Sequence, residues 1–426
     1  MYWLVENEEQ LNVLINSGYK KAFIEVIPYN DTIHPVQNHV SLVYIRPIEA
    51  SKGFMVCIAH SEATNELITC KTSIEKLINK FEVLYCRDKK EMLHYFPNKT
   101  LYDITPPPHT YIRPTTQTHD LYYRKHQDNS KLNLIIPIVK HYELCETIFR
   151  DLKANINIEK TEYNEFFNSK TSMVFNSIER SGIRIHNETF SEYFHPVDGE
   201  YVYTQFNLKT TTTRPSNKFK NVNYAALNKE NGCRKSFIPR NSRFVEIDIS
   251  AYHPSLAARL VNYTFPTSDI HSHFASLYNV GYKKSKELTF KQLYGGVFEN
   301  YKGLEFFKRI EGFVIKTWNE FNEKGYTKCP ISNFVYTKEN LGEMNPQKLF
   351  NYILQNMETS QNILVLWDMC RILRGCKTKL VLYTYDSFTF DIDDREIEVL
   401  DSIREIFKKY KLNIKEETGY DYNFGG

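Results

Sequence analysis

Arg243-Phe-Val-Glu-Ile-Asp-Ile-Ser-Ala-Tyr-His-Pro-Ser-Leu256 is the stretch of sequence on which the prediction of the fold rests. The apolar residues within 244–249 form a short run that is typical of a largely buried strand. Turn-forming and helix-starting residues follow, and a helical apolar pattern resumes over 256–260. Asp248 is therefore expected at the end of a strand, at the rim of a sheet. An aspartate in this position more often caps the next helix, so it indicates little about function by itself.

A second acid is expected in a comparable setting. Lys379-Leu-Val-Leu-Tyr-Thr-Tyr-Asp-Ser-Phe-Thr-Phe-Asp-Ile392 contains two β-rich runs on either side of Tyr385-Asp386-Ser387, which predicts a hairpin with Asp386 at its tip. Two carboxylates that converge on one point raise each other's pKa unless cations lie between them. Divalent metal ions that bind both carboxylates and substrate phosphates would relieve this repulsion.

A third segment, 283–294, lies between the two acids, has helical period and ends at Gly295-Gly296. Lys286, Phe290 and Tyr294 recur every four residues on one of its faces. A cation and two aromatic rings on one stripe suit a triphosphate, a base and a template. An ordinary amphipathic helix with a glycine stop explains the segment equally well when it is considered alone. The order of acid, helix and acid is more specific than any one of the three segments.

In this order the segments resemble the polymerase region of the family A nucleic-acid polymerases, the group that contains bacterial DNA polymerase I and many phage replicases. Asp248-Ile-Ser resembles motif A of the family, and Tyr385-Asp386-Ser387 resembles motif C. Lys286, Phe290 and Tyr294-Gly295 resemble motif B, including its spacing of four and eight residues. Weaker similarities extend the resemblance over about residues 170–426, at Thr213-Arg214-Pro-Ser216, Arg234-Lys-Ser-Phe237, Asp269-Ile-His-Ser-His-Phe-Ala275 and Asn351-Tyr-Ile-Leu-Gln355.

Two departures from the family concern the choice of sugar. The fifth residue after the motif A aspartate is, in cellular members, a glutamate that excludes a ribose 2′-hydroxyl, whereas His253 stands here. Motif C of the DNA enzymes commonly reads His-Asp-Glu, and the Asp-Ser found here also occurs in single-subunit RNA polymerases. We expect a preference for deoxynucleotides with relaxed exclusion of ribonucleotides.

The resemblance implies a metal-dependent reaction. Asp248 and Asp386, together with the backbone carbonyl of Ile249, would bind two Mg²⁺ ions, for which Mn²⁺ could substitute. Phosphoryl transfer depends mainly on positioning and on neutralising the charge of the triphosphate. Asp248, Asp386 and Lys286 are therefore the predicted catalytic residues, and Lys286 is also a candidate proton donor to the leaving group.

The resemblance also implies a set of nucleotide-binding residues. Lys286 and Arg234 would bind the phosphates of the incoming nucleotide. Phe290 would stack on its base, and Tyr294 would guard the template position. His253 would lie near the incoming sugar.

Four further residues are predicted to contact primer–template DNA. Arg214 would contact a phosphate or the primer terminus. Asn345-Pro346 is typical of a helix start, and Gln347, Asn351 and Gln355 then recur every four residues along one helical face. Amides suit the minor groove because both base-pair types present acceptors there. A polar face exposed to solvent is the alternative interpretation.

The predicted fold is a mixed α+β right-hand polymerase with palm, fingers and a reduced thumb, preceded by an α/β exonuclease-like domain. A short thumb predicts low processivity or dependence on a processivity or replisome partner. The expected domains are an exonuclease-like domain over 1–130, thumb and connection over 131–200, the first part of the palm over 201–265, fingers over 266–340 and the second part of the palm over 341–426. A polar linker is expected over 106–130.

The exonuclease-like domain is expected to be inactive. Its first 105 residues alternate strand-like and helical patterns, as an α/β domain does. Proofreading chemistry needs an Asp-x-Glu pair on the first strand and two further acids, which together hold two metal ions. The first strand offers only Glu25, and Asp103 and Glu146 could be relics of the later acids.

The composition excludes a mainly disordered chain, because 42% of the 426 residues are apolar and 14% are aromatic. The net charge of +3 does not by itself indicate a nucleic-acid partner. A basic stripe between Lys209 and Arg243 is more informative, and we favour phosphate binding over an ordinary solvated face. Its members are Arg214, Lys218, Lys220, Lys229, Arg234, Lys235 and Arg240, against the single acid Glu230.

The expected location is cytoplasmic, which would be the bacterial host cytoplasm if the chain is phage-encoded. No apolar run approaches the roughly 18–20 residues of a membrane span. The first nine residues are acidic and lack a targeting pattern, and the eight cysteines lack the spacing of a zinc site.

The predicted function is template-directed addition of deoxynucleotides to a DNA primer, with primer–template DNA and deoxynucleoside triphosphates as partners. One alternative is an RNA polymerase or primase-like enzyme that uses ribonucleotides. The other is a non-catalytic protein that binds primer–template DNA, although binding alone would not need paired carboxylates that face DNA phosphates.

Overall fold

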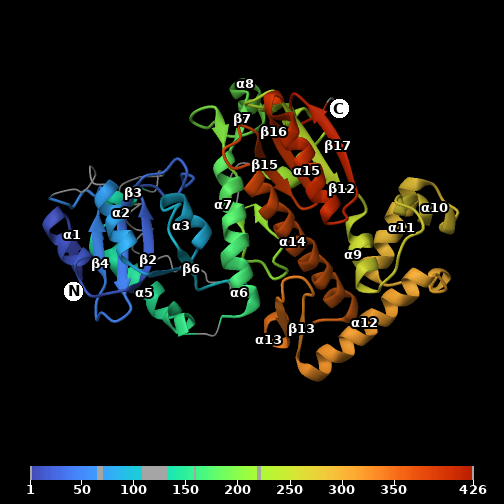
Figure 1. The fold of residues 1–426 in the computed structure, drawn as a ribbon, viewed down its shortest axis with the longest axis horizontal. Helices are drawn as coiled ribbons and strands as arrows, with labels where there is room; N and C mark the ends of the chain where they lie inside the picture. The colour runs from blue at the N-terminus through green and yellow to red at the C-terminus, as the bar shows by residue number, and fades with distance from the viewer. Residues whose placement is uncertain (1, 65–70, 108–131, 158–159, 218–221, 425–426) are drawn as a thin grey trace. The chain divides into compact units, whose positions relative to one another are not determined.

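The computed structural model describes residues 2–64, 71–107, 132–157, 160–217 and 222–424 (Figure 1). The chain forms two compact units, Met1–Asn176 and Ser177–Gly426, and each has its own core. The linker predicted over 106–130 lies outside the described residues apart from its first two positions, and so do Lys218 and Lys220 of the basic stripe. Within the described ranges, no helix combines the length and the hydropathy that a membrane span requires.

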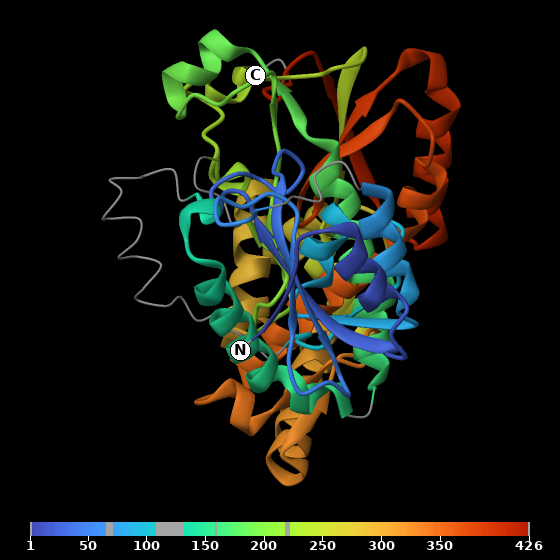
Figure 2. The ribbon, with the colours of Figure 1, turned by 90° about the vertical axis from the view of Figure 1, so that its left-hand side faces the viewer.

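The N-terminal unit is built on a six-stranded sheet in the order β1-β4-β3-β2-β5-β6 (Figure 2). β3 pairs antiparallel with both β2 and β4, whereas the pairs β2–β5, β5–β6 and β1–β4 are parallel. The strands are β1 (Trp3–Val5), β2 (Lys21–Pro28), β3 (Val40–Pro47), β4 (Phe54–Cys57), β5 (Val83–Cys86) and β6 (Leu101–Asp103).

The central strand β2 is buried on both faces, and its side chains alternate between two helical layers. Ala22, Ile24 and Val26 pack with three helices on one face, whereas Phe23 and Ile27 pack with α5 on the other. This period of two is the geometry of a strand between two layers. The helices are α1 (Glu8–Ile15), α2 (Lys71–Lys80), α3 (Lys89–Tyr95) and α5 (Ile138–Leu152). The α/β alternation predicted for this region is confirmed.

The division into units falls after Asn176. α5 lies in the range predicted as the thumb, and it packs against β2 and β3 of the N-terminal sheet. The chain then continues through α6 (Glu162–Phe166), the π-helical turn η3 (Phe167–Thr171) and α7 (Ser172–Ser181).

The core of the C-terminal unit is a four-stranded antiparallel sheet in the order β15-β16-β12-β17 (Figure 1). The strands are β12 (Arg243–Ile249), β15 (Lys379–Thr384), β16 (Ser387–Ile392) and β17 (Ile414–Gly419). On one face, Phe388 packs against Phe407 of α15 (Ile397–Lys409), with ring centroids 5.4 Å apart. On the other face, Phe244 joins a cluster with Phe237 and Tyr422. The strand over 244–249 and the hairpin about Tyr385-Asp386 are confirmed.

Short elements surround this sheet. Phe237 and its neighbours belong to a three-stranded sheet in the order β11-β7-β8, and β9 pairs with β10. These elements are β7 (Ile183–Ile185), α8 (Asn187–Tyr193), β8 (Tyr201–Val202), β9 (Phe206–Asn207), β10 (Ser216–Asn217) and β11 (Phe237–Ile238).

The longest helix, α14 (Pro346–Ile372), begins where the sequence predicts. Asn345 is its N-cap and accepts a hydrogen bond of 2.8 Å from the backbone N–H of Lys348, and Pro346 needs no partner in the first turn. The apolar face of α14 is buried, and Figure 1 shows the helix extending from the four-stranded sheet towards α12 and β13. α14 thus connects the sheet with the helical region that follows.

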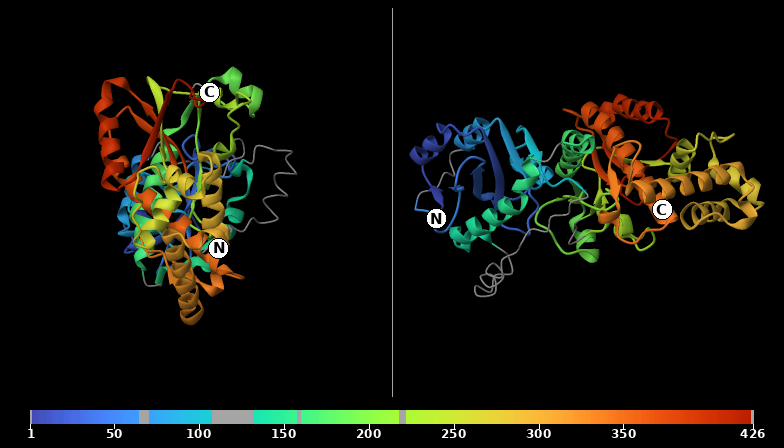
Figure 3. Two further views of the ribbon diagram at one scale, coloured as in Figure 1. Left: turned by 90° about the vertical axis from the view of Figure 1, so that its right-hand side faces the viewer. Right: turned by 90° about the horizontal axis from the view of Figure 1, so that it is seen from below.

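That helical region carries α10 (Ile270–Tyr278), α11 (Tyr282–Gly295) and α12 (Glu305–Lys324), which lie together in Figure 3. Phe274 of α10 packs against Phe306 and Phe307 of α12, with ring centroids 5.6 and 5.4 Å apart. Three short elements complete the region, namely β13 (Tyr326–Lys328), β14 (Val335–Thr337) and α13 (Lys338–Leu341). The helix predicted over 283–294 is confirmed as α11, and α9 (Tyr252–Leu260) links this region to β12.

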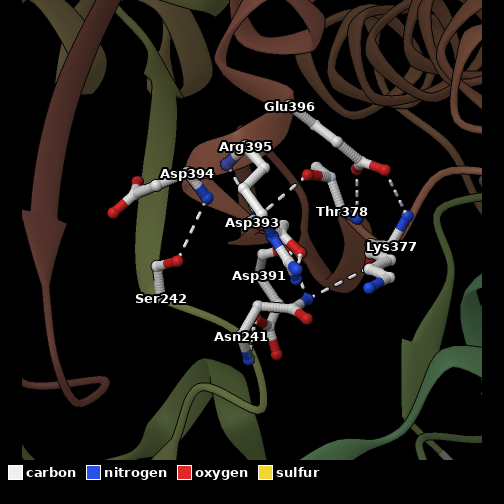
Figure 4. A network of polar contacts seen from close by, with 9 residues as sticks. All are labelled: Asn241, Ser242, Lys377, Thr378, Asp391, Asp393, Asp394, Arg395 and Glu396. Atoms are coloured by element: carbon white, nitrogen blue, oxygen red, sulfur yellow. Dashed lines mark hydrogen bonds and ion pairs between the residues drawn. The ribbon is translucent and has the colours of Figure 1, made fainter.

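A polar network fixes the open end of the β15–β16 hairpin (Figure 4). The buried carboxylate of Asp391 accepts hydrogen bonds from the backbone N–H groups of Arg240 (2.8 Å) and Asn241 (3.0 Å). The carboxylate of Glu396 accepts from the backbone N–H groups of Lys377 (2.9 Å) and Thr378 (2.8 Å). These bonds hold the starts of β12 and β15 to the end of β16, and so they fix the strands that carry Asp248 and Asp386.

We expect Asp391→Ala to lower the free energy of unfolding by roughly 3 kcal/mol. The substitution removes a buried carboxylate and leaves the backbone N–H groups of Arg240 and Asn241 without their acceptor. Asp394 is half exposed and forms an ion pair of 2.8 Å with Arg243. Asp394→Ala should therefore cost less than about 1 kcal/mol. Urea denaturation of both variants checks this, and equal losses would contradict the structural importance of Asp391.

Candidate active site

A cavity of about 630 Å³ brings together side chains from the four-stranded sheet and from α9, α10, α11 and α14. Most of the residues that the sequence singles out line this cavity. They are Asp248, Ile249, Asp386, Lys286, Phe290, Tyr294, His253 and Arg214. The segments that carry Asp248, the α11 stripe and Asp386 therefore lie around one cavity.

Strand pairing positions the two acids. Asp248 is the last but one residue of β12 and pairs with Ser387, the first residue of β16. Asp386 lies in the turn just before Ser387, and its backbone carbonyl accepts a hydrogen bond of 2.9 Å from the N–H of Ile249. Tyr385 adopts a positive φ of 59°, which allows the two-residue turn. The two carboxylates are thus held at adjacent strand ends.

The protein surroundings disfavour the charged forms of both acids. Burial, followed by the charges of Asp386 and Glu246, raises the pKa of Asp248 to about 6. Asp386 is at the tip of the turn, yet neighbouring protein atoms partly withdraw its carboxylate from water, and this and the charge of Glu358 raise its pKa. Neither carboxylate forms an ion pair with a residue that the structure describes. Carboxylate oxygens that are not engaged in an ion pair are the donor set that Mg²⁺ or Mn²⁺ binds, so the residues fit such ions.

A chain of polar contacts crosses the floor of the cavity. The hydroxyl of Tyr294 lies 2.6 Å from Nδ1 of His253, and Nε2 of His253 contacts the carboxylate of Glu358. The other oxygen of Glu358 accepts a hydrogen bond of 3.2 Å from Arg214. Glu358 and His253 are buried. Both ring nitrogens of His253 therefore have partners.

The same chain reaches the turn that carries Asp386. The guanidinium of Arg214 lies over the ring of Tyr385, 3.7 Å from its centroid. The backbone carbonyl of Tyr385 also accepts a hydrogen bond of 2.7 Å from Asn362 of α14. Helices α11, α9 and α14 and the hairpin turn are thereby linked through side chains on one side of the cavity.

The stripe of Lys286, Phe290 and Tyr294 on α11 lines the cavity. Phe290 and Tyr294 are stacked, with centroids 5.7 Å apart and an interplanar angle of 16°. His271 of α10 packs against Phe290 at 5.8 Å. Lys286 lies one turn before Phe290, is exposed, and forms no ion pair with any residue in the described part of the chain. Its ammonium group is therefore free to meet an anion in the cavity.

Four other predicted residues do not line the cavity, and they are Arg234, Gln347, Asn351 and Gln355. The guanidinium of Arg234 donates hydrogen bonds of 3.2 and 3.0 Å to the backbone carbonyl of Leu227, and it lies over the ring of Tyr422. Asn351 donates a hydrogen bond of 3.1 Å to the backbone carbonyl of Tyr294, so it supports the end of α11. The predicted nucleotide contact of Arg234 therefore has no support from its position.

The described arginines of the basic stripe are directed to different partners. The guanidinium of Arg240 lies 3.4 Å from the buried carboxylate of Asp391, and that of Arg234 is directed to Leu227. Only Arg214 of the described members lines the cavity, and it is paired with Glu358. Sequence proximity grouped arginines whose side chains the fold directs to different partners.

The lining residues that were given no role from the sequence include His271, Glu358 and Lys415. Glu358 had a detectable signal, because it is the only charged residue of α14 between Lys348 and Asp368. His271 lies in the segment that resembles the one before motif B. Lys415 had no local signal, because its place depends on the pairing of β17 with β12.

No protein-family model and no curated protein sequence matches the chain. Among solved structures, the chain is similar to the POL domain of Pol1 from M. smegmatis, which is in complex with DNA primer-template and dNTP. The TM-score is 0.69 and the sequence identity is 12%, over 99% of each chain. The chain therefore has the fold of that polymerase domain, and the fold that the three motifs imply is confirmed at this level.

The raised pKa of Asp248 has a measurable effect on the metal-free protein. The pKa of Asp248 is about 6 in the folded protein and about 3.9 in the unfolded chain. The protonated carboxyl of Asp248 therefore contributes to the free energy of unfolding below about pH 4, and this contribution is lost as the pH rises through 6. We expect metal-free Asp248→Asn to be more stable than wild type at pH 7.5, by about 1 kcal/mol after allowance for solvent screening. The difference should disappear near pH 4.

Urea denaturation in a chelating buffer at both pH values checks this expectation. Asp401→Asn is a matched control, because Asp401 is an exposed residue of α15 that pairs with Arg404. A gain in stability for Asp248→Asn that is equal at both pH values would show that the pKa of Asp248 is not raised by folding.

Proposed function

We propose that the chain is a template-directed DNA polymerase of family A, which adds deoxynucleotides to the 3′-hydroxyl of a DNA primer. One observation carries this proposal. Asp248, Asp386 and the stripe of Lys286, Phe290 and Tyr294 line a single cavity, in a chain with the fold of a polymerase domain. At a sequence identity of 12%, the structural similarity supports the fold alone. The residues that line the cavity support the proposed activity.

The proposed metal ligands are Asp248 and Asp386, with the backbone carbonyl of Ile249 as a third. Mg²⁺ bound there would favour the ionised primer 3′-hydroxyl and neutralise the triphosphate, and Mn²⁺ could substitute. The paired, partly buried carboxylates support this assignment, because neither of them forms an ion pair with a described residue.

The proposed roles of the α11 stripe follow from its chemistry. Lys286 is exposed in the cavity and would bind a phosphate of the incoming nucleotide. The ring of Phe290 would stack on the base, as aromatic side chains do with every base. Tyr294 is stacked on Phe290 and would stand at the template position.

His253 supports a preference for deoxynucleotides. Its two ring nitrogens contact Tyr294 and Glu358, so neither nitrogen is available to a ribose 2′-hydroxyl. A buried hydroxyl without a partner costs about 1–3 kcal/mol, which would lower the efficiency with ribonucleotides.

Primer extension tests the proposed function. With Mg²⁺ and a primed DNA template, we expect extension by deoxynucleotides that is more efficient than with ribonucleotides. Asp386→Asn should lower the rate by at least about a hundredfold, because one of two metal-binding carboxylates is lost. Asp401→Asn, a matched change on the exposed side of α15, should extend primers as the wild type does.

The alternatives give different results in this assay. Equal use of both nucleotides, or synthesis without a primer, would favour the RNA polymerase or primase-like function. Binding of primer–template DNA without extension by either nucleotide would favour the non-catalytic function.

We also propose that the N-terminal unit does not proofread. The carboxylate of Glu25 is buried and forms an ion pair of 2.8 Å with Arg87. The buried carboxylate of Asp103 accepts from the backbone N–H groups of Lys89 (3.0 Å) and Thr105 (2.8 Å). Glu146 accepts from the hydroxyl of Tyr44 at 2.8 Å. Each acid is thus held by protein groups, which opposes metal binding.

We expect the wild-type protein to leave a labelled primer undigested in Mg²⁺ or Mn²⁺ when no nucleotide is present. Gel analysis over hours checks this, with Asp386→Asn as a control for the polymerase site. Metal-dependent shortening of the primer that Asp103→Ala abolishes, and that Asp386→Asn retains, would contradict the proposal.

A further inference from the structure

Lys415 occupies a position in β17 directly opposite Asp248. The two strands are antiparallel, and the register pairs Asp248 with Lys415 and Glu246 with Glu417. Paired residues of neighbouring strands project to the same face of a sheet. Lys415 therefore lies on the face that carries Asp248. Glu416 projects to the opposite face, where its carboxylate accepts a hydrogen bond of 2.8 Å from Arg404 of α15.

Lys415 also faces the helical side of the cavity. It lines the cavity together with Asp248, His271 and Lys286. Burial lowers the pKa of His271 on α10, and the positive charges of Lys286 and Lys415 lower it further. The same two charges oppose the rise in the pKa of Asp248 that burial and its acidic neighbours cause. The two lysines therefore flank one space from the sheet and from α11.

The ammonium group of Lys415 forms no ion pair within the described ranges of the chain. Arg214, the arginine of the cavity, is already paired with Glu358. Lys286 and Lys415 therefore differ from Arg214, because each can bind an added anion in the cavity without first breaking an ion pair with a described carboxylate.

Two ordinary explanations for Lys415 compete with a functional one. β17 is the last strand of its sheet, and exposed edge strands often carry lysines that discourage pairing with other chains. Lys415 could also simply offset the charges of Glu246, Asp248 and Glu417 on its face. The first explanation does not account for its position in the cavity, and the second predicts an effect on metal ions instead of on the nucleotide.

We propose that Lys415 binds the terminal phosphates of the incoming nucleotide, from the wall of the cavity opposite to Lys286. The inference rests on the proposed polymerase function. Its chemical basis is that an ammonium group acts as a point charge for phosphate, and that a triphosphate carries several negative charges near Asp248. The pyrophosphate product would contact the same lysine before it leaves.

Nucleotide binding to a complex that cannot react tests this inference. The enzyme is bound to a primer–template with a dideoxy-terminated primer in Mg²⁺, and the Kd of the correct deoxynucleoside triphosphate is measured by calorimetry. We expect Lys415→Gln to raise this Kd about tenfold, as the loss of one charge-assisted contact does. Lys415→Arg should restore the Kd to within about threefold, because the charge is retained.

Lys408→Gln is the matched control, since Lys408 is an exposed lysine of α15 that pairs with Glu405. Its Kd for the nucleotide should equal that of the wild type. In steady-state extension, Lys415→Gln should raise the KM for the nucleotide about tenfold and leave the Kd for primer–template DNA unchanged.

If Lys415→Gln binds the nucleotide with the same Kd as the wild type, the inference is overturned. This holds also if the variant changes the affinity for Mg²⁺ alone. If the wild type extends primers, the proposed function then survives without a role for Lys415. A wild type that extends no primer would overturn the proposed function and this inference together.

Discussion

The structure depends on the placement of two like charges at neighbouring strand ends. β12 ends at Ile249 and the β15–β16 turn carries Asp386, so backbone pairing holds two carboxylates where the charge of Asp386 disfavours that of Asp248. A fold tolerates such an arrangement when cations are recruited to it. The raised pKa of Asp248 follows from this arrangement, and the cavity that Asp248 lines offers the space in which a cation could bind.

The rest of the C-terminal unit supports that placement from two directions. At the far end of the hairpin, Asp391 and Glu396 bind backbone N–H groups and fix the strands (Figure 4). At the cavity, the chain from Tyr294 through His253 and Glu358 to Arg214 ties three helices to the turn of Asp386. Lys286 of α11 and Lys415 of β17 line the same cavity.

Local patterns in the sequence predicted the elements that carry the site. The strand before Asp248, the hairpin at Asp386, the α11 stripe and the Asn345 cap are each specified by neighbouring residues, and the structure contains them. Predictions that depended on side-chain direction were weaker. Arg234 of the basic stripe donates to the backbone carbonyl of Leu227, and Arg240 pairs with the carboxylate of Asp391. The pairing of Lys415 with Asp248 joins segments more than 160 residues apart, which no local pattern encodes.

The central claim is that Asp248 and Asp386 form one site for divalent cations. Electron paramagnetic resonance of Mn²⁺ tests it directly, with the protein bound to a dideoxy-terminated primer–template and the correct nucleotide. The account predicts two bound Mn²⁺ ions per chain in the wild type, and loss of this binding when Asp248 and Asp386 are both replaced by Asn. Two Mn²⁺ ions bound with unchanged affinity in that double variant would contradict the account.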